Sequence, residues 1–153
     1  MTLIQSKYAK GIAPIAYPSV AGGVVAMRFA HTIAAAMQVG DILELGVIPA
    51  GTRVVDAILD CDDIDTDGAA AVSFDVGIMS GDVGADDGAR TCGNQFFSGS
   101  TIGRAGGVER ASIKTAFRTA AAAADRAIGV KCTAAAAAFA AGQIGLTVLL
   151  ATE

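Results

Sequence analysis

The sequence has few of the side chains that carry out catalysis. It contains one histidine, three cysteines and no tryptophan, and only 17% of its residues are charged, against roughly 25% in an average soluble domain. The single histidine, His31, falls in a strand-like stretch beside Phe29 and Ile33, a setting typical of a core or interface histidine. No nucleophile motif accompanies it. We therefore predict that the protein is not an enzyme and has no catalytic residues.

Sites for cofactors are also scarce. Cys61, Cys92 and Cys132 are odd in number and lack C-x-x-C spacing, which indicates neither a disulfide framework nor a zinc knuckle, so we expect reduced thiols. The glycine-rich stretch GSTIGRAGG (99–107) matches neither common phosphate-binding motif. No cofactor is predicted. The cationic residues in and after this stretch are expected on a solvated or subunit-contacting face: Arg104, Arg110 and Lys114.

Charge and hydropathy exclude two kinds of partner. The net charge is −4 and the sequence pI is about 4.8, and Lys and Arg form no cluster, so no nucleic-acid partner is expected. The start, MTLIQSKYAKG, lacks the apolar core of a signal peptide, and no charge-free apolar run is long enough to span a bilayer. We expect a protein made in the cytoplasm with no membrane partner.

What the sequence has in quantity is small and apolar residues. Hydrophobic residues make up 53% of the chain, and 19 glycines accompany them. A monomer with so little charge would leave apolar patches in water, so part of the surface is expected to be buried against other copies. This favours an oligomer.

Short runs that alternate between apolar and polar residues predict a sheet protein. In 24–33, Phe29, His31 and Ile33 share one face opposite Arg28, the repeat of two that defines a strand. Further strands are expected at 41–51, 52–63, 70–81, 112–119, 126–133 and 143–151. The strand in 52–63 should bury Val55, Ala57, Leu59 and Cys61. About seven or eight strands fit an all-β fold, an antiparallel β-sandwich that is jelly-roll-like. Its core is expected to contain Leu59, Phe74, Val76, Ile128, Leu146 and Val148.

Three stretches do not follow the strand pattern. Alanine favours helix, but 120–124 and 134–141 are short, lack an amphipathic stripe and lie between strand-like runs. We interpret them as a turn and a hairpin loop. The third stretch, 91–111, is predicted to be mostly glycine-punctuated loop, with a short helical turn around 94–98.

The first 23 residues differ from the rest and are expected to form an extended N-terminal arm (1–23), followed by a single sandwich domain (24–153). The arm contains Pro14, Pro18 and the Gly22–Gly23 pair, and no periodicity persists in it. It lies along its own sheet or along a neighbouring subunit, or it is a frayed terminus. We expect it to contribute little to the core and to contact another subunit of an assembly through its apolar side chains, Tyr8, Ile12, Ile15 and Tyr17.

One acidic stretch, DDIDTDG, opens like a calcium loop. Asp63, Asp65, Asp67 and Gly68 match the first half of an EF-hand loop, but the bidentate acid at its twelfth position is replaced by Phe74. The spacing also fits a hairpin turn, in which Asp accepts backbone hydrogen bonds and Gly supplies a positive φ. We predict the turn and no metal, with the three aspartates as weak metal candidates. A second acidic loop contains Asp82, Asp86 and Asp87.

Four motifs in a fixed order carry a resemblance to a known family. They are IPAGTRVVDAILDCDDIDT (48–66), DVG (75–77), GSTIGRAGG (99–107) and DRAIGVKCT (125–133). Together they resemble the small head decoration, or cement, proteins of tailed bacteriophages. The alanine-rich TAAAAAFAAG departs from the family pattern.

The resemblance implies a β-rich virion protein. Members are commonly homotrimers that bind the outer capsid surface near threefold positions and stabilise the lattice of the major capsid protein. The partners implied are the major capsid protein and other copies of the chain, after synthesis in the host cytoplasm. Two alternatives stay open: another virion structural protein, such as a tail or fibre component, and a calcium-dependent β-sandwich binding module.

Overall fold

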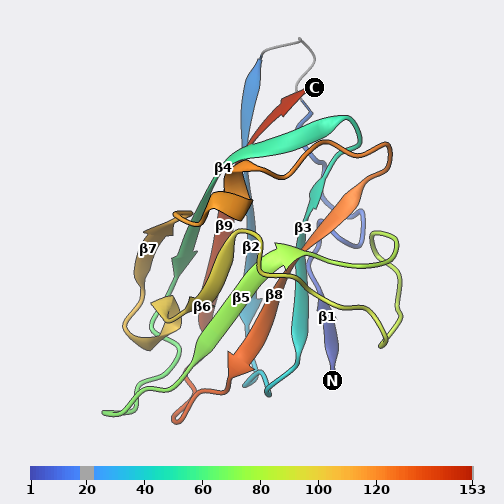
Figure 1. The fold of residues 1–153 in the computed structure, drawn as a ribbon. Coiled ribbons are helices and arrows are strands. Elements are labelled where there is room, and N and C mark those ends of the chain that lie inside the picture. Colours follow the sequence, from blue (N-terminus) through green and yellow to red (C-terminus); the bar gives the residue numbers. More distant parts are fainter. Residues whose placement is uncertain (18–22, 153) are drawn as a thin grey trace.

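The computed structural model describes residues 1–17 and 23–152. They form two β-sheets packed face to face (Figure 1), so the prediction of an all-β antiparallel sandwich is confirmed. One sheet has the order β1-β3-β8-β5-β6 and the other β2-β9-β4-β7. The elements are β1 (Leu3–Gln5), β2 (Val24–Ile33), β3 (Ile42–Ile48), β4 (Thr52–Cys61), β5 (Ser73–Ile78), β6 (Phe97–Ser100), the 3-10 helix η1 (Ile102–Arg104), β7 (Gly107–Arg110), the 3-10 helix η2 (Lys114–Phe117), β8 (Arg126–Ala134) and β9 (Gly142–Thr152).

The strand order is that of a jelly roll. Strands β2 to β9 divide into two four-stranded sets, and every connection among them except β5 to β6 passes from one sheet to the other. Strand β1 is added at the edge of the first sheet, where it pairs in parallel with β3. The prediction of a jelly-roll-like sandwich is therefore confirmed in its topology as well as in its class.

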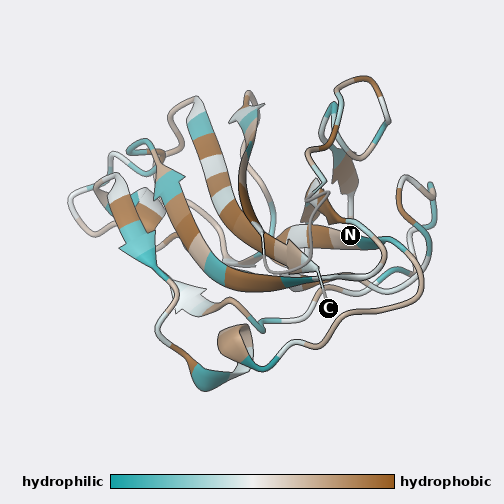
Figure 2. Ribbon diagram, turned by 90° about the horizontal axis from the view of Figure 1, so that it is seen from above, coloured by the Kyte–Doolittle hydropathy of each residue, from teal (hydrophilic) through white to brown (hydrophobic). Residues whose placement is uncertain are grey.

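Alternation along the strands builds the core between the sheets. In β9, every second side chain from Ile144 to Leu150 is fully buried, and in β2 Phe29 and Ile33 face the same interior. Figure 2 shows the resulting bands of apolar and polar residues along the strands. All residues predicted for the core are buried, namely Leu59, Phe74, Val76, Ile128, Leu146 and Val148.

Strand β4 departs from its predicted pattern at its start. A β-bulge lies between Val54 and Asp56 in the pairing with β9, and it turns Val54 to the core in place of Val55. From Ala57 onwards the alternation holds as predicted. One extra residue reverses which side chains face the core in the part of the strand that precedes it. Counting alternate residues in the sequence does not reveal such a bulge.

Two sequence predictions in the region 91–119 are wrong. The stretch 112–119, expected to be a strand, contains η2; Ile113 and Ala116 both face the core, and this spacing of three fits a 3-10 helix. The expected helical turn at 94–98 is absent from the described chain, which forms β6 and β7 with η1 between them instead.

Two predicted hairpin connections also differ from the structure. The loop 62–72 joins β4 to β5, and the alanine-rich loop 135–141 joins β8 to β9, and in both cases the joined strands belong to different sheets. Neither loop is therefore a hairpin. The two crossings lie next to each other at the lower end of the sandwich in Figure 1, joined by a bridge between Asp65 and Phe139. The stretch 120–124 is non-helical, as predicted.

The N-terminal segment contributes more to the core than expected. Ile4, Tyr8 and Ile15 pack against the main core, and the Tyr8 ring meets Phe29 edge to face with 4.9 Å between ring centroids. Ser6 is buried and its hydroxyl donates to the Leu45 carbonyl. The segment thus covers the gap between the two sheets. Of the features that suggested an arm, Pro18 and Gly22 lie outside the described residues.

A buried ion pair fastens the loop 80–90 to β3. Arg90 and Glu44 are both buried, with 2.7 Å between Nη1 and Oε2. Burial alone would raise the pKa of Glu44, but hydrogen bonds from Arg90, the Gly84 amide and Gln5 together lower it. Glu44 therefore stays ionised, and removal of either partner would leave an uncompensated buried charge.

Replacement of Gly46 with alanine tests the contact between the sheets. A Cβ atom at Gly46 would lie 2.4 Å from the ring of Phe29, and overpacking a core costs about 1–3 kcal/mol. We expect Gly46→Ala to lower the free energy of unfolding by about that amount in urea denaturation. Gly68→Ala is the control, because nothing lies within 4 Å of its Cβ position. Equal stability of the two variants would contradict the packing described.

Candidate functional site

The acidic loop that resembles a calcium site is organised around one buried carboxylate. Asp65 is 1% exposed. Its Oδ2 accepts the amides of Ala71 at 2.7 Å and Val72 at 3.0 Å, and its Oδ1 accepts the amide of Ala138 at 2.9 Å. One side chain therefore fastens the β4–β5 crossing to the β8–β9 crossing.

These hydrogen bonds keep Asp65 ionised. The amide of Ala138, followed by those of Val72, Ala137 and Ala71, lowers the pKa of the carboxyl well below its usual range, against the opposing effect of burial. A carboxylate that accepts several backbone N–H groups is stabilised in its charged form. The charge is thus compensated by peptide dipoles within the chain.

The other two aspartates of the motif also serve the backbone. Asp63 accepts the amide of Asp65 at 3.2 Å, and Asp67 accepts the amide of Ala69 at 2.7 Å. Gly68 does not adopt a positive φ, so that part of the turn prediction is wrong. Within residues 1–17 and 23–152, no three His, Cys, Asp or Glu side chains are grouped so that they could hold a metal ion.

The second acidic loop is fixed in a similar way. Asp87 accepts the amide of Ala89 at 2.8 Å, and the neighbouring Arg90 enters the buried pair with Glu44. In both acidic loops, therefore, aspartates accept backbone amides and so fix the path of the chain.

His31 lies half-buried at the edge of the sandwich, on β2. Burial and the nearby charge of Lys10 lower its pKa, so the imidazole is neutral at pH 7. None of the hydrogen bonds found among the described residues involves the His31 side chain. Its position agrees with the core or interface setting predicted from the sequence.

The glycine-rich stretch 99–107 is packed against the core. A Cβ atom at Gly103 would lie 3.0–3.2 Å from Ile64, Val72 and Phe74. Arg104 donates to the carbonyl oxygens of Val72 and Ala71. Glycine is therefore needed at position 103, where the backbone lies close to these core side chains. Arg104 holds the end of the loop 62–72 in place.

The thiols are held in their protonated form. All three cysteines are free in the described structure, with Cys61 and Cys132 buried and Cys92 half-buried. Burial raises the pKa of Cys61 to about 12 and those of Cys92 and Cys132 to about 11. Since the thiolate is the reactive species, these cysteines behave as small apolar side chains.

The four predicted contact residues of the N-terminal segment divide into two pairs. Tyr8 and Ile15 pack inward against the core, whereas Ile12 is 75% and Tyr17 52% exposed. Their contact with other subunits stays a prediction.

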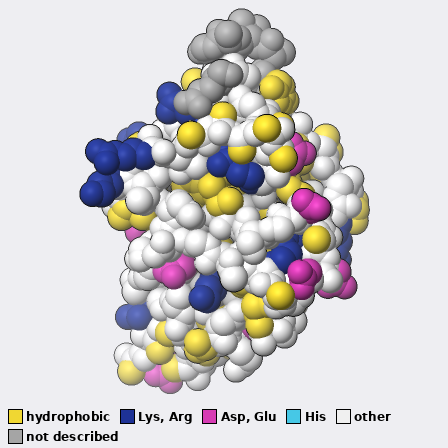
Figure 3. Space-filling view, turned by 45° about the vertical axis from the view of Figure 1, so that its right-hand side comes forward, with side chains coloured by type: hydrophobic (Ala, Val, Ile, Leu, Met, Phe, Trp, Pro, Cys, Tyr) yellow, Lys and Arg dark blue, Asp and Glu magenta, His cyan; other side chains and the backbone are white. Residues whose placement is uncertain are grey.

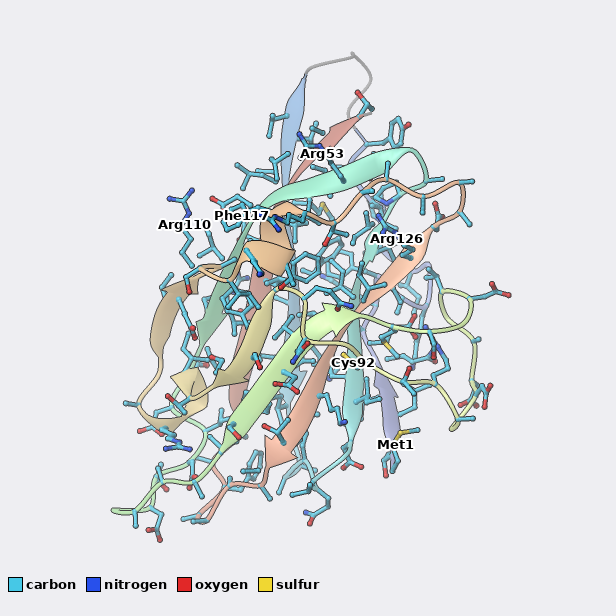
Figure 4. All side chains as sticks on the ribbon, viewed as in Figure 1. Met1, Arg53, Cys92, Arg110, Phe117 and Arg126 are labelled. Carbon is cyan, nitrogen blue, oxygen red and sulfur yellow. The ribbon has the colours of Figure 1, made fainter. Side chains whose placement is uncertain are left out.

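Sequence reasoning missed a second exposed apolar region at β7 and η2. Val108 is 74% exposed and Phe117 is partly exposed. Arg110, paired with Asp56, lies on the same side of the molecule as Phe117 (Figure 4). No sequence signal marked Val108 and Phe117 as exposed, because β7 and η2 were not predicted, whereas Arg110 was expected on a solvated or subunit-contacting face and its side chain is exposed. On the face seen in Figure 3, apolar side chains are dispersed among a few charged ones.

The polar side chains thus hold loops in place, while apolar side chains are exposed at two edges of the sandwich. This combination is typical of a structural protein that forms contacts with other subunits. Among solved structures, a chain in the capsid of Ralstonia phage GP4 matches with a TM-score of 0.95 and 48% sequence identity, over 99% of each chain. The chain therefore belongs to the same family of bacteriophage capsid proteins. It is a structural protein of a virion.

Two further capsid structures share the fold. A chain of the cyanophage Pam1 capsid matches with a TM-score of 0.70 at 21% identity, over 94% of this chain and 96% of that one. A chain from the acid-stable capsid of Helicobacter pylori bacteriophage KHP30 matches with a TM-score of 0.53 at 15% identity, over 84% and 90%. No family model and no curated protein matches the sequence. Among the described residues, no helix has the length and apolar character needed to cross a bilayer.

Replacement of Asp65 with asparagine tests the role of the buried carboxylate. Asparagine keeps the size but loses the charge and one acceptor oxygen, so we expect the melting temperature at pH 7 to fall by about 5 °C or more. Asp67→Asn is the control, because that exposed carboxylate accepts one local amide; its melting temperature should change by about 1 °C or less.

Acid should reduce the stability difference between the wild type and Asp65→Asn. The folded pKa of Asp65 is lowered, so the stabilisation is complete above the unfolded pKa near 3.9 and is lost as the pH falls through the folded pKa. The stability gap between wild type and Asp65→Asn should be constant above about pH 5 and narrow below about pH 4. A gap that widens on acidification would refute this assignment.

Chelation tests whether the acidic loops also hold a cation. Because Asp63, Asp65 and Asp67 each accept backbone amides, we expect EDTA to leave the melting temperature unchanged within about one degree, whereas a bound structural metal would add stability by mass action. A fall of several degrees, reversed by added Ca²⁺, would show that the loop is a metal site.

Proposed function

We propose that this protein is a capsid decoration, or cement, protein. It binds the outer surface of the phage head near threefold positions as a homotrimer and stabilises the lattice of the major capsid protein. The observation that carries the proposal is the match, over essentially the whole of both chains, to a chain of an assembled phage capsid. The four motifs between 48 and 133 support the decoration role, since they resemble those of cement proteins.

The internal chemistry supports a passive role. The buried charges are compensated within the chain, as in the pair of Glu44 with Arg90 and the amides around Asp65. The thiols are protonated. A protein that reinforces a shell needs a rigid core and contact surfaces, and catalysis is no part of this proposal.

The placement of exposed apolar residues supports a cyclic trimer. Val24 on β2 and Val108 on β7 are both more than half exposed, and β2 and β7 are the opposite edges of the four-stranded sheet. A ring of subunits joins two different surfaces of each copy. Contact between the start of the β2 edge of one copy, at Val24, and the β7 edge of the next would bury both valines.

The oligomeric state tests this arrangement. We expect light scattering to give a trimer at micromolar concentration, and Val108→Asp to dissociate it, because a charge would be buried at the contact. Val39→Asp is the control, since Val39 is 65% exposed but lies in the loop between β2 and β3; this variant should stay trimeric. A monomeric wild-type protein would contradict the trimer.

Binding to emptied capsids that lack the protein tests the function itself. We expect purified protein to occupy such capsids to saturation and to raise the temperature at which they break open, because a ligand that binds only the intact lattice stabilises it. Binding to tails or fibres with none to heads would favour a tail or fibre component instead.

A further inference from the structure

Strand β2 has a free edge along its whole length. It pairs with β9 from Val24 to Ile33, and within residues 1–17 and 23–152 no hydrogen bond joins its backbone to any other segment. In an antiparallel pair, alternate residues direct their N–H and C=O groups away from the partner strand. The outer edge of β2 therefore presents a row of unpaired backbone groups, a template for an added strand.

A groove of about 490 Å³ lies beside the second half of this edge. Lys7 and Lys10, from the segment after β1, line one side, and His31 and Thr32 of β2 line the other. Gln143 of β9 also lines it. No Asp or Glu side chain is among the described residues that line the groove, although acidic residues outnumber basic ones in the chain, 15 to 11.

The two lysines hold uncompensated positive charge. Neither forms an ion pair with a carboxylate among the described residues, and Lys7 lies over the ring of Tyr8, 5.2 Å from its centroid. The nearby Arg28 differs, because Asp60 neutralises it across the backbone of β9. The groove therefore carries positive charge that no carboxylate among the described residues neutralises.

A smaller apolar cavity adjoins the groove. It has a volume of about 210 Å³, is lined by Ile4, Met37 and Leu43, and shares His31 and Thr32 with the groove. A ligand in the groove can therefore place an apolar side chain in this cavity while its charged groups stay beside the lysines.

From these four features we infer that the groove binds an extended acidic segment of the shell subunit on which the protein sits. The segment adds as a strand to the second half of the β2 edge, beside His31 and Thr32, with carboxylates facing Lys7 and Lys10 and one apolar side chain in the adjoining cavity. Main-chain pairing supplies affinity in this mode of recognition, and the pockets supply specificity. The identity of the partner as a shell subunit rests on the proposed function.

Other occupants fit the groove less well. Two lysines in a chain of net charge −4 are few for a nucleic-acid backbone, whose binding depends on neutralising many phosphates. A second copy of this chain would show itself as a change in oligomeric state when the lysines are altered, and the experiment below measures that state.

The test compares two double charge reversals for binding to emptied capsids that lack the protein. Lys7→Glu with Lys10→Glu should weaken binding about tenfold or more, because like charges would face each other in the groove. Lys114→Glu with Arg118→Glu makes the same change of charge on exposed residues in and beside η2, and it should bind as the wild type does. Both variants should keep the wild-type melting temperature and oligomeric state. Binding of the wild type should also weaken as salt is raised.

The possible results distinguish failure of the groove assignment from failure of the proposed function. Equal binding of the groove variant and the wild type would overturn the groove assignment and leave the decoration role standing. Loss of the oligomer in the groove variant alone would overturn it too, since the partner would be a second copy. No binding of the wild type to capsids would overturn the proposed function and this inference with it.

Discussion

Nearly every connection between strands passes from one sheet to the other, and the rest of this structure depends on that constraint. A crossing loop cannot pair with itself as a hairpin does, yet its backbone N–H groups still need partners. Carboxylates supply them. Asp65 accepts amides from both crossings at one end of the sandwich, including that of Ala138. At the other end, Asp125 accepts the amide of Ala50. Asp41, at the same end as Asp65, accepts two amides near the start of β3.

The acidic side chains at these positions thus serve the backbone of the fold. Asp65 and Glu44 are buried but remain charged, because amides or Arg90 compensate them. The interactions that remain available are at the surface, at the free edge of β2 and at the apolar side chains of β2 and β7. A rigid interior with contact surfaces at its edges suits a structural protein of a capsid, the family to which the chain belongs.

The sequence predicted the strands better than it predicted their partners. The predicted strands at 24–33, 41–51, 52–63, 70–81, 126–133 and 143–151 correspond to β2, β3, β4, β5, β8 and β9, each of six residues or more. Strands β6 and β7 have only four residues each, too few for a periodic signal. The sheet to which a strand belongs depends on distant pairing, so the loops 62–72 and 135–141 were mistaken for hairpins. The spacing of Asp63, Asp65 and Asp67 marked an important loop. It did not show that Asp65 is the buried carboxylate that joins the two crossings, because burial depends on distant parts of the chain.

The most direct test of the account is a reconstruction of the native phage particle by electron cryomicroscopy. The proposed role predicts density for this sandwich on the outside of the head, as trimers near threefold positions, with the second half of the β2 edge of each copy against a strand of the shell beneath. Density for the sandwich in the tail, or on the inner surface of the head, would contradict it.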